Sequence, residues 1–192
     1  MVFFTSDPHF YHDKDFVWQV RGFKNIDEMN AEIVRRWNER VMPDDDIYVL
    51  GDLTLGNIDA GIALIATLNG KLHIMRGNHD TDKKVERYLE LPNVIEVKYA
   101  DVLKYGKAVF WMGHYPTITA NYDDDKPWAK HVVCLFGHTH QEQPFYNDNP
   151  YMFNVGMDAH NCTPISIEEI IETIRNKKQE LNNEKAKENI NV

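Results

Sequence analysis

Five short apolar runs of this chain each end in aspartate, asparagine or histidine, usually with a glycine beside them. The runs are rich in β-branched and large apolar residues and have the length of buried strands. In chain order, each run and the cluster after it are 2–6 with Asp7-Pro8-His9, 46–50 with Gly51-Asp52, 71–76 with Gly77-Asn78-His79-Asp80, 107–112 with Gly113-His114, and 132–136 with Gly137-His138-Thr139-His140. Open α/β sheets bind ligands at the carboxyl ends of their strands, so these polar side chains are expected to meet at one rim.

Helical segments alternate with the apolar runs. Asn25, with Glu28 three residues further on, resembles a capping box at the start of an amphipathic helix. A second helix is predicted over 58–68, and a third begins at Ser166 with Glu169 in its cap. This alternation predicts an α/β fold in layers, with helices outside the sheets.

The composition is typical of one globular domain. The chain has 192 residues, of which 43% are hydrophobic and 27% are charged. We expect a single domain over 1–175 and a polar tail over 176–192 that forms a frayed helix or is disordered. No apolar run approaches the roughly 20 residues that span a bilayer, and Cys134 and Cys162 have no zinc or disulfide spacing. A cytoplasmic protein without a membrane partner is therefore predicted.

Each polar cluster taken alone is weak evidence for a metal site. An isolated Asp-x-His or Gly-Asp is most often a turn or a helix cap, whereas the His-x-His at 138–140 is a stronger signal. The combination is informative, because chance would have to place such residues at the same end of five strands. Carboxylate, carboxamide and imidazole without thiolate suit Mn, Fe, Co, Ni or Zn.

The ordered set Asp-x-His, Gly-Asp, Gly-Asn-His-Asp, Gly-His and Gly-His-x-His resembles the signature of the calcineurin-like metallophosphoesterases. The resemblance runs from Phe4 to about Asp158 and looks closest to the small members without a cap domain from bacteria and phages. It implies a four-layer αββα sandwich of the metallo-dependent phosphatase type. It also implies two divalent metal ions at the loop ends of the sheets, with Mn as the first expectation.

The resemblance further implies a role for each matching residue. One metal ion would be held by Asp7, His9 and His140, the other by Asn78, His114 and His138, and Asp52 would bridge both. His79 matches the histidine that contacts the scissile phosphate and protonates the leaving oxygen, so Asp52 and His79 are the catalytic candidates and Asn78 is also a substrate contact. Two ions can share a hydroxide that attacks phosphorus in line.

Two further residues are candidate substrate contacts. The guanidinium of Arg21 suits a bidentate contact with phosphate, and His12 follows the first motif closely enough to reach the substrate. For both residues an ordinary surface or supporting role is an equal alternative. The segment 154–158 resembles the closing segment of the small members, where it supports the metal rim without binding metal.

The second motif departs from that of the protein Ser/Thr phosphatases. After Gly51-Asp52 it continues Leu53-Thr54-Leu55-Gly56, without the further Asp and Arg of those enzymes. This argues against a protein phosphatase and removes the aspartate that would pair with His79. Asp80 and Asp13 are the alternatives for that partner.

The predicted function is hydrolysis of a small phosphate ester, with a phosphodiester favoured over a monoester. A nucleotide-like or cyclic diester would suit an open groove without a cap. The net charge of −9 argues against long nucleic acid as a partner, although bound metal ions would attract a small anion. A non-catalytic scaffold that binds a protein partner and a nuclease are the alternatives. The sequence does not indicate an oligomeric state.

Overall fold

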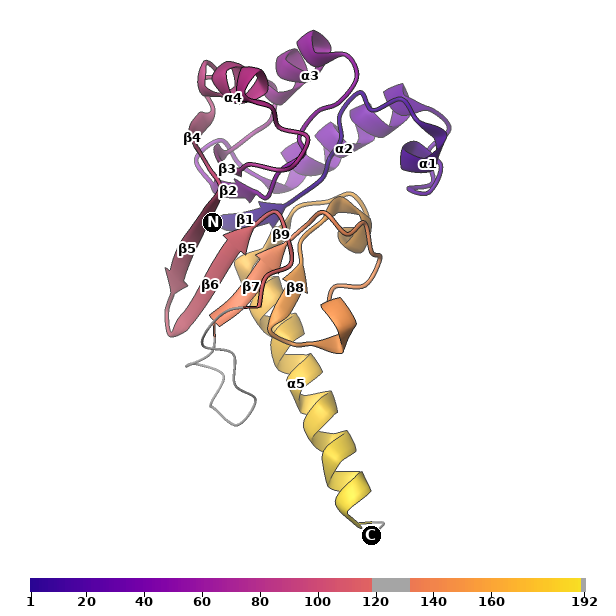
Figure 1. Cartoon of the computed structure of the whole chain (residues 1–192), viewed down its shortest axis with the longest axis vertical. Coiled ribbons are helices and arrows are strands. Elements are labelled where there is room, and N and C mark those ends of the chain that lie inside the picture. Colours follow the sequence, from indigo (N-terminus) through magenta and orange to yellow (C-terminus); the bar gives the residue numbers. More distant parts are fainter. Residues whose placement is uncertain (119–131, 191–192) are drawn as a thin grey trace.

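The computed structural model describes residues 1–118 and 132–190, with side chains up to Lys187. Its strands form two mixed sheets (Figure 1). The five-stranded sheet has the order β4-β3-β2-β1-β9, with the bounds Val94–Lys98, Lys71–Met75, Asp46–Val49, Val2–Thr5 and Ile165–Ser166. The four-stranded sheet has the order β5-β6-β7-β8, with the bounds Ala100–Tyr105, Ala108–Gly113, Val132–Phe136 and Met152–Asn154.

The strands that precede the polar clusters run parallel within their sheets. β1, β2 and β3 are parallel neighbours, with Phe3 opposite Ile47 and Ile47 opposite Leu72. In the other sheet β6, β7 and β8 are also parallel neighbours. Parallel strands place their carboxyl ends at one edge of the sheet, which is the edge where the clusters follow.

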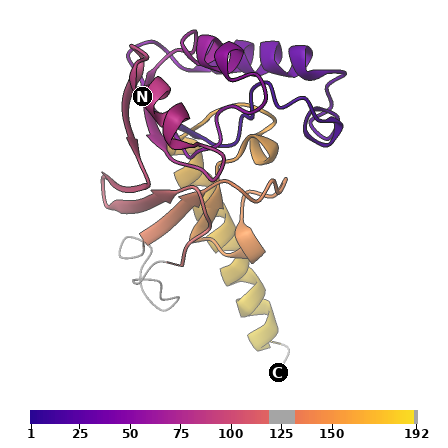
Figure 2. The same ribbon diagram turned by 45° about the horizontal axis from the view of Figure 1, so that its top comes forward.

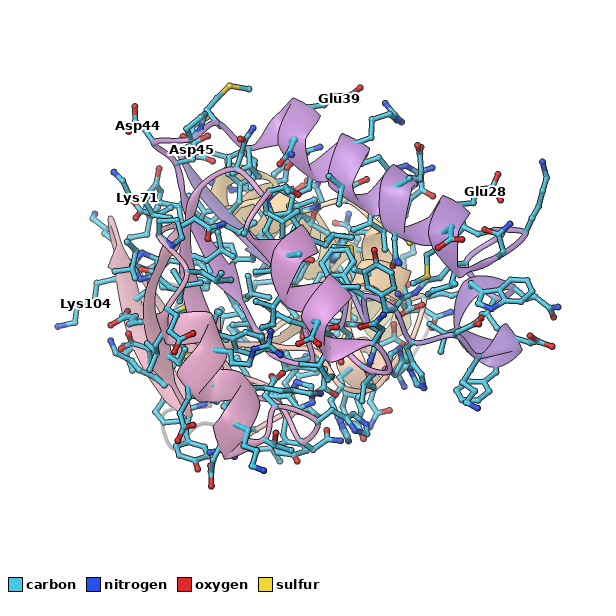
Figure 3. The ribbon with its side chains drawn as sticks, turned by 90° about the horizontal axis from the view of Figure 1, so that it is seen from above. Glu28, Glu39, Asp44, Asp45, Lys71 and Lys104 are labelled. Atoms are coloured by element: carbon cyan, nitrogen blue, oxygen red, sulfur yellow. The ribbon has the colours of Figure 1, made fainter. Side chains whose placement is uncertain are left out.

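Four helices contribute to the apolar cluster on the outer face of the five-stranded sheet, with α1 at the side of the molecule beyond α2 (Figures 1 and 2). They are α1 Asp15–Trp18, α2 Ile26–Arg40, α3 Ile58–Ile65 and α4 Asp82–Leu89. Glu28 and Glu39, near opposite ends of α2, both point to solvent in Figure 3. The opposite face of α2 buries Met29, Ile33 and Trp37 completely, and each such side chain stabilises the fold by about 1.5–3 kcal/mol.

The two sheets pack face to face over a second apolar cluster. Phe4 from β1, Phe110 from β6 and Leu135 from β7 are fully buried in it. The helix α5, Ile167–Ile190, adds Ile170 and Ile174 to the same cluster. On the outer face of the four-stranded sheet a smaller cluster centres on Phe136 and Cys134, with Tyr146 of the short helix η2, Tyr146–Asp148, against it.

These features confirm the α/β sandwich with two sheets and the capped helices. Asn25 Oδ1 accepts a hydrogen bond of 2.8 Å from the Glu28 backbone N–H, and Ser166 Oγ donates to Glu169 Oε2 at 2.8 Å. The helix predicted over 58–68 is three residues shorter, and α1, α4, β4 and β5 were not predicted. α5 continues to Ile190 without a break, so the predicted tail begins inside a helix, and the boundary at 175 stays a prediction.

Among the residues that the structure describes, no helix combines the length and the apolar character needed to cross a membrane.

Candidate metal centre

The loops that follow the strands hold the candidate ligands in an uncommon backbone conformation. Five of these residues have a left-handed φ: Asp7 at 56°, His9 at 51°, Asp52 at 54°, His138 at 65° and His140 at 51°. Such a conformation costs a non-glycine residue of order 1–3 kcal/mol and persists only where the surrounding structure enforces it. Strain of this kind gathers at functional sites.

Backbone hydrogen bonds between the loops enforce this arrangement. The Asp7 N–H donates to the Gly51 carbonyl at 3.0 Å, and the His9 N–H donates to the Asp52 carbonyl at 3.2 Å. The loops approach so closely that a Cβ at Gly77 would collide with the Asp52 carboxylate. Glycine is therefore required there, and the first and second motifs are held together as one unit.

One group of candidate ligand atoms is formed by Asp7, His9 and His140. His9 Nε2 lies 3.2 Å from His140 Nε2 and 3.7 Å from Asp7 Oδ1. His140 Nε2 is 4.0 Å from the same carboxylate oxygen. Asp7 and His9 are buried, whereas His140 is half exposed. Three ligand atoms thus face a common point with one open side.

A second group is formed by Asp7, Asp52 and His114. Asp52 Oδ2 lies 3.5 Å from His114 Nε2 and 4.0 Å from His9 Nε2, so it faces both groups. Asn78 Oδ1 is 2.9 Å from His114 Nε2. The His138 ring packs edge-on against the His114 ring, with 4.9 Å between their centroids. All seven predicted ligand residues therefore come together at the strand ends.

The residues fit a pair of divalent cations. Asp7 Oδ1 is buried without a hydrogen-bond partner in the described part of the chain, which is costly for a carboxylate oxygen unless a cation satisfies it. Two imidazole nitrogens, His9 Nε2 and His140 Nε2, point at each other and at this oxygen. Oxygen and imidazole donors without thiolate suit Mn, Fe, Co, Ni or Zn.

The protonation states also favour a cation. Burial opposes ionisation of Asp7, but the nearby imidazoles of His9 and His114 outweigh it and lower the Asp7 pKa to about 2. Burial likewise opposes ionisation of Asp52, and His114 brings the pKa of that carboxyl below its ordinary value. Both carboxylates are therefore anionic at neutral pH and attract positive charge.

His79 lies at the edge of this group with its backbone fixed at both ends. Its N–H donates to Asp52 Oδ1 at 2.8 Å, and its carbonyl accepts from Lys84 Nζ at 2.8 Å. Lys84 is buried and also donates to the Thr54 carbonyl at 2.6 Å. The sequence reading missed this lysine, because it lies on a helix that was not predicted and has no motif around it.

The suggestion that Asp80 orients the His79 ring is wrong. The Asp80 carboxylate is buried and accepts hydrogen bonds from the backbone N–H groups of Asp52 and Gly77 and from the Tyr88 hydroxyl. It therefore braces the loops. The carboxylate oxygen that the structure places near His79 Nε2 is Asp52 Oδ2, at 4.0 Å. In the described chain no contact joins Asp13 to the His79 ring.

Arg21 has a different role from the predicted phosphate contact. Its guanidinium binds both oxygens of Asp158 at 2.9 Å and donates to the backbone carbonyls of Asp7 and Pro8. The side chain is only 2% exposed, and its fifth N–H group points at Met29 Sδ, which lies 3.8 Å from Nη1. No donor is left for a phosphate, so the geometry argues against the prediction and assigns Arg21 to the support of the first motif.

Asp158 links this arginine to the candidate ligand His140. It lies in the short helix η3, Met157–His160, and its Oδ2 is 2.9 Å from His140 Nδ1. Burial opposes its ionisation, but His140 and Arg21 lower its pKa well below the ordinary range. A carboxylate on the far nitrogen of a ligand histidine orients the ring and increases its basicity. Asp158 thus gives the segment 154–158 a supporting role, as the resemblance implies, because it holds the His140 ring through Nδ1.

His12 lies beside the candidate metal residues. Its ring is 5.4 Å from the His9 ring and 5.7 Å from the Phe16 ring, measured between centroids. Burial, together with the charges of His9 and His79, lowers the pKa of His12 to about 4. The imidazole is therefore neutral at pH 7. It lines a cavity that His79 shares.

The fold and the site together define an α/β sandwich with a candidate metal centre at the carboxyl ends of strands from both sheets. Within that class the chain belongs to the calcineurin-like phosphoesterase superfamily, because the model of the calcineurin-like phosphoesterase superfamily domain matches residues 1–168. This confirms the resemblance drawn from the ordered motifs.

Two relatives and one solved structure of similar fold have nearly the same extent as this chain. The uncharacterised protein MJ1445 of Methanocaldococcus jannaschii is 32% identical over 181 residues, which are 90% of each chain. The gene 66 protein of Mycobacterium phage D29 is 28% identical over 188 residues, 85% of this chain and 92% of that protein. The crystal structure of AQ665 from Aquifex aeolicus, a protein of unknown function, superimposes with a TM-score of 0.68 at 22% identity, covering 90% of this chain and 98% of the other. This last likeness concerns the fold alone.

Proposed function

We propose that this chain hydrolyses a small phosphate ester with the help of two bound divalent metal ions. The observation that carries the proposal is the convergence of two buried carboxylates, Asp7 and Asp52, with imidazole nitrogens from three strand ends. A structural metal site needs no open side, whereas this group borders a cavity through His140. Membership of a phosphoesterase superfamily indicates phosphate esters as the substrate class.

The proposed ligands divide into two sets joined by Asp52. Asp7, His9 and His140 form one set, and Asn78, His114 and His138 form the other. Asp52 Oδ2 is within 4.0 Å of His9 Nε2 and 3.5 Å of His114 Nε2, which supports a bridging role. A pair of divalent ions supplies Lewis-acid activation of water and of the phosphoryl group, and Mn is the first ion to test.

His79 is the proposed proton donor to the leaving oxygen. Its side chain is 46% exposed and lines the cavity, while its backbone is held by Asp52 and Lys84. A fixed backbone with an accessible ring is the arrangement that general acid catalysis needs, because the donor must reach the substrate in one orientation. The neutral ring of His12 lies on the same cavity wall and is a proposed substrate contact.

A diester is favoured over a monoester because two separate recesses adjoin the candidate site. One recess of about 440 Å³ is lined by His79 and His140. A second, of about 480 Å³, is lined by Asn78, Arg76 and Tyr115 and shares no lining residue with the first. A phosphodiester carries an organic group on each side of phosphorus, and each group has a recess to enter.

The test is release of nitrophenol from bis(p-nitrophenyl) phosphate and from p-nitrophenyl phosphate, with added Mn²⁺ and with a chelator. We expect metal-dependent release that the chelator abolishes, and faster turnover of the diester. Metal content is measured in parallel for Asp52→Asn and for the control Asp46→Asn, whose side chain contacts His73 at the far end of the strand.

The expected metal content is two ions for the wild type and the control and none for Asp52→Asn, because the bridging carboxylate is lost. Two bound ions in Asp52→Asn would contradict the bridging assignment. A protein that binds two ions and hydrolyses neither these esters nor nucleotides would contradict the proposed function and would favour a non-catalytic scaffold.

A further inference from the structure

One wall of the cavity beside the candidate metal centre is apolar. The cavity has a volume of about 440 Å³, within the range of small-molecule sites. His9, His79 and His140 line the side that faces the metal residues. Phe16, Val17 and Val20, from α1 and the turn after it, line the other side. The cavity therefore has a polar side, next to the proposed phosphate position, and an apolar side that an uncharged organic group can contact.

The apolar wall is exposed where a ligand would cover it. Phe16 is 68% exposed and Val20 is 67% exposed, whereas Val17 between them is anchored in the core. Single exposed apolar residues are common on protein surfaces. Two large ones at the mouth of a cavity that also contains candidate catalytic histidines are better explained by an organic group that packs against them.

This wall is held in place relative to the metal residues. The Phe23 N–H donates to the Trp18 carbonyl and closes the turn after α1. Arg21, inside that turn, donates to the backbone carbonyls of Asp7 and Pro8 and pairs with Asp158. A ligand in the cavity would therefore meet a preformed surface, which reduces the entropy lost on binding.

The charge of the lining indicates a neutral occupant. Arg21 and Asp158 both border the cavity, but each neutralises the other at 2.9 Å. Phe16, Val17 and Val20 carry no charge. A second phosphate or a carboxylate would find no unpaired cation among the residues of this wall, so the group that enters is the uncharged part of the substrate.

The rings in the lining favour a flat aromatic group. The Phe16 ring stands edge-on to the His12 ring, with an interplanar angle of 89°. The His12 ring neighbours the His9 ring, which in turn neighbours the His79 ring at 5.9 Å. Aromatic side chains bind planar rings by stacking and edge-to-face contacts, whatever the substituents of the ring.

We propose that this cavity binds an aromatic ring of the substrate against Phe16 and Val20, while the phosphate lies at the metal residues. The substrate class is then an aryl or nucleoside phosphate ester, and a nucleobase and a phenyl ring share the chemistry that is recognised. The position of the phosphate depends on the proposed function. The ring site is inferred independently, from the residues that line the cavity.

The test uses phosphonates, whose phosphorus–carbon bond is not hydrolysed, so that binding is measured without turnover. Titration calorimetry on the Mn²⁺-loaded protein compares phenylphosphonate, cyclohexylphosphonate and methylphosphonate. We expect phenylphosphonate to bind roughly fivefold or more tightly than methylphosphonate, with cyclohexylphosphonate between them. Phe16→Ala should reduce the phenyl-to-methyl ratio to near one, and Phe16→Tyr should restore most of it.

The matched control is Met42→Ala. Met42 is an exposed apolar residue whose N–H donates to Asp45, directly before β2 begins at Asp46, and its loss should leave the ratio unchanged. Equal binding of phenyl- and methylphosphonate, or a ratio that survives in Phe16→Ala, would overturn the ring site. Cyclohexylphosphonate as tight as phenylphosphonate would overturn its aromatic preference. A retained ratio in a protein without esterase activity would support the ring site and count against the proposed function alone.

Discussion

The candidate ligands combine two properties that single residues rarely share, burial of charge and a strained backbone. Asp7 and Asp52 are each at most 2% exposed and both have φ near 55°. Neither property is favourable by itself, since buried carboxylates and left-handed aspartates each cost free energy. Bound cations would offset the first cost, and hydrogen bonds between the loops maintain the second. The stability of such a site would therefore depend on whether cations are bound.

Replacing His79 with asparagine should lower turnover roughly a hundredfold or more, because asparagine has no proton to transfer at neutral pH. Metal content should not change, since His79 is not one of the proposed metal ligands and the hydrogen bonds of its backbone N–H and carbonyl remain. The measurement is kcat with a nitrophenyl ester together with metal analysis. His73→Asn is the control, because His73 lies between Asp46 and Glu96, away from the site. Wild-type turnover in His79→Asn would remove His79 from the mechanism.

Acidification should weaken the metal-free protein through Asp7. Its pKa in the folded protein is about 2, below the ordinary value of 3.8. A depressed pKa contributes stability that is present above the unfolded value and is lost as the pH falls through the folded one. The difference corresponds to about 2 kcal/mol.

This pH dependence is measured by urea denaturation of chelator-treated protein between pH 5 and pH 2. The free energy of unfolding of the wild type should fall by about 2 kcal/mol more than that of Asp7→Asn over this window. Parallel losses in the two proteins would show that Asp7 is not the group that titrates.

At the scale of elements, the site is assembled from loops that are far apart in the sequence. The segment after β1, the turn that contains Arg21, the loop after β7 and the helix η3 meet through one ion pair, that of Arg21 and Asp158. Arg21 also binds the backbone that precedes His9. Four segments thus share one buried ion pair, so a change in any of them alters the support of the candidate ligand His140.

Asp158→Asn should weaken metal binding about 10- to 100-fold, because the amide keeps the shape of the side chain but not the charge that orients His140. Metal affinity is measured by competition with a chelator of known affinity. Asp59→Asn is the control, since Asp59 forms an exposed ion pair with Arg87 on α3 and α4. Equal affinity in Asp158→Asn and the wild type would limit Asp158 to a structural contact with Arg21.

At the scale of the whole molecule, the two sheets and α5 share one apolar cluster, whereas the end of α5 is outside it. Figure 1 shows α5 extending well beyond the sheets. Ile174 is the last fully buried side chain among those of this helix that the structure describes, Lys177 pairs with Asp148, and the side chains of 182–187 are exposed. We therefore predict that the packed domain ends within this helix.

Deleting residues 183–192 should change the free energy of unfolding by no more than about 0.5 kcal/mol, since the side chains of 183–187 are exposed and exposed side chains contribute little. Ile170→Ala, inside the cluster, should cost about 2–5 kcal/mol by leaving a cavity. Thermal and urea unfolding of the two variants beside the wild type make the comparison. A truncated chain that loses as much stability as Ile170→Ala would place the end of the domain beyond residue 182.

Much of the fold was predictable, because buried strands are read from their own composition. The runs at 2–6, 71–76 and 132–136 are strands as expected, since both of their faces are covered. β4 and β5 were missed because their exposed positions break the apolar pattern. α1 has only four residues, too few for a helical period to appear in the sequence.

The sequence by itself determined which residues could bind metal, because the type of each side chain and its place after a strand are local properties. Only the tertiary structure decided what surrounds them. Asp80 became a loop brace, Arg21 became the partner of Asp158, and Phe16 became the wall of a cavity. The physical reason is that these roles depend on contacts between segments up to 137 residues apart. A motif specifies the chemistry of its own side chains, whereas hydrogen-bond partners, burial and the shape of a cavity arise when distant segments pack.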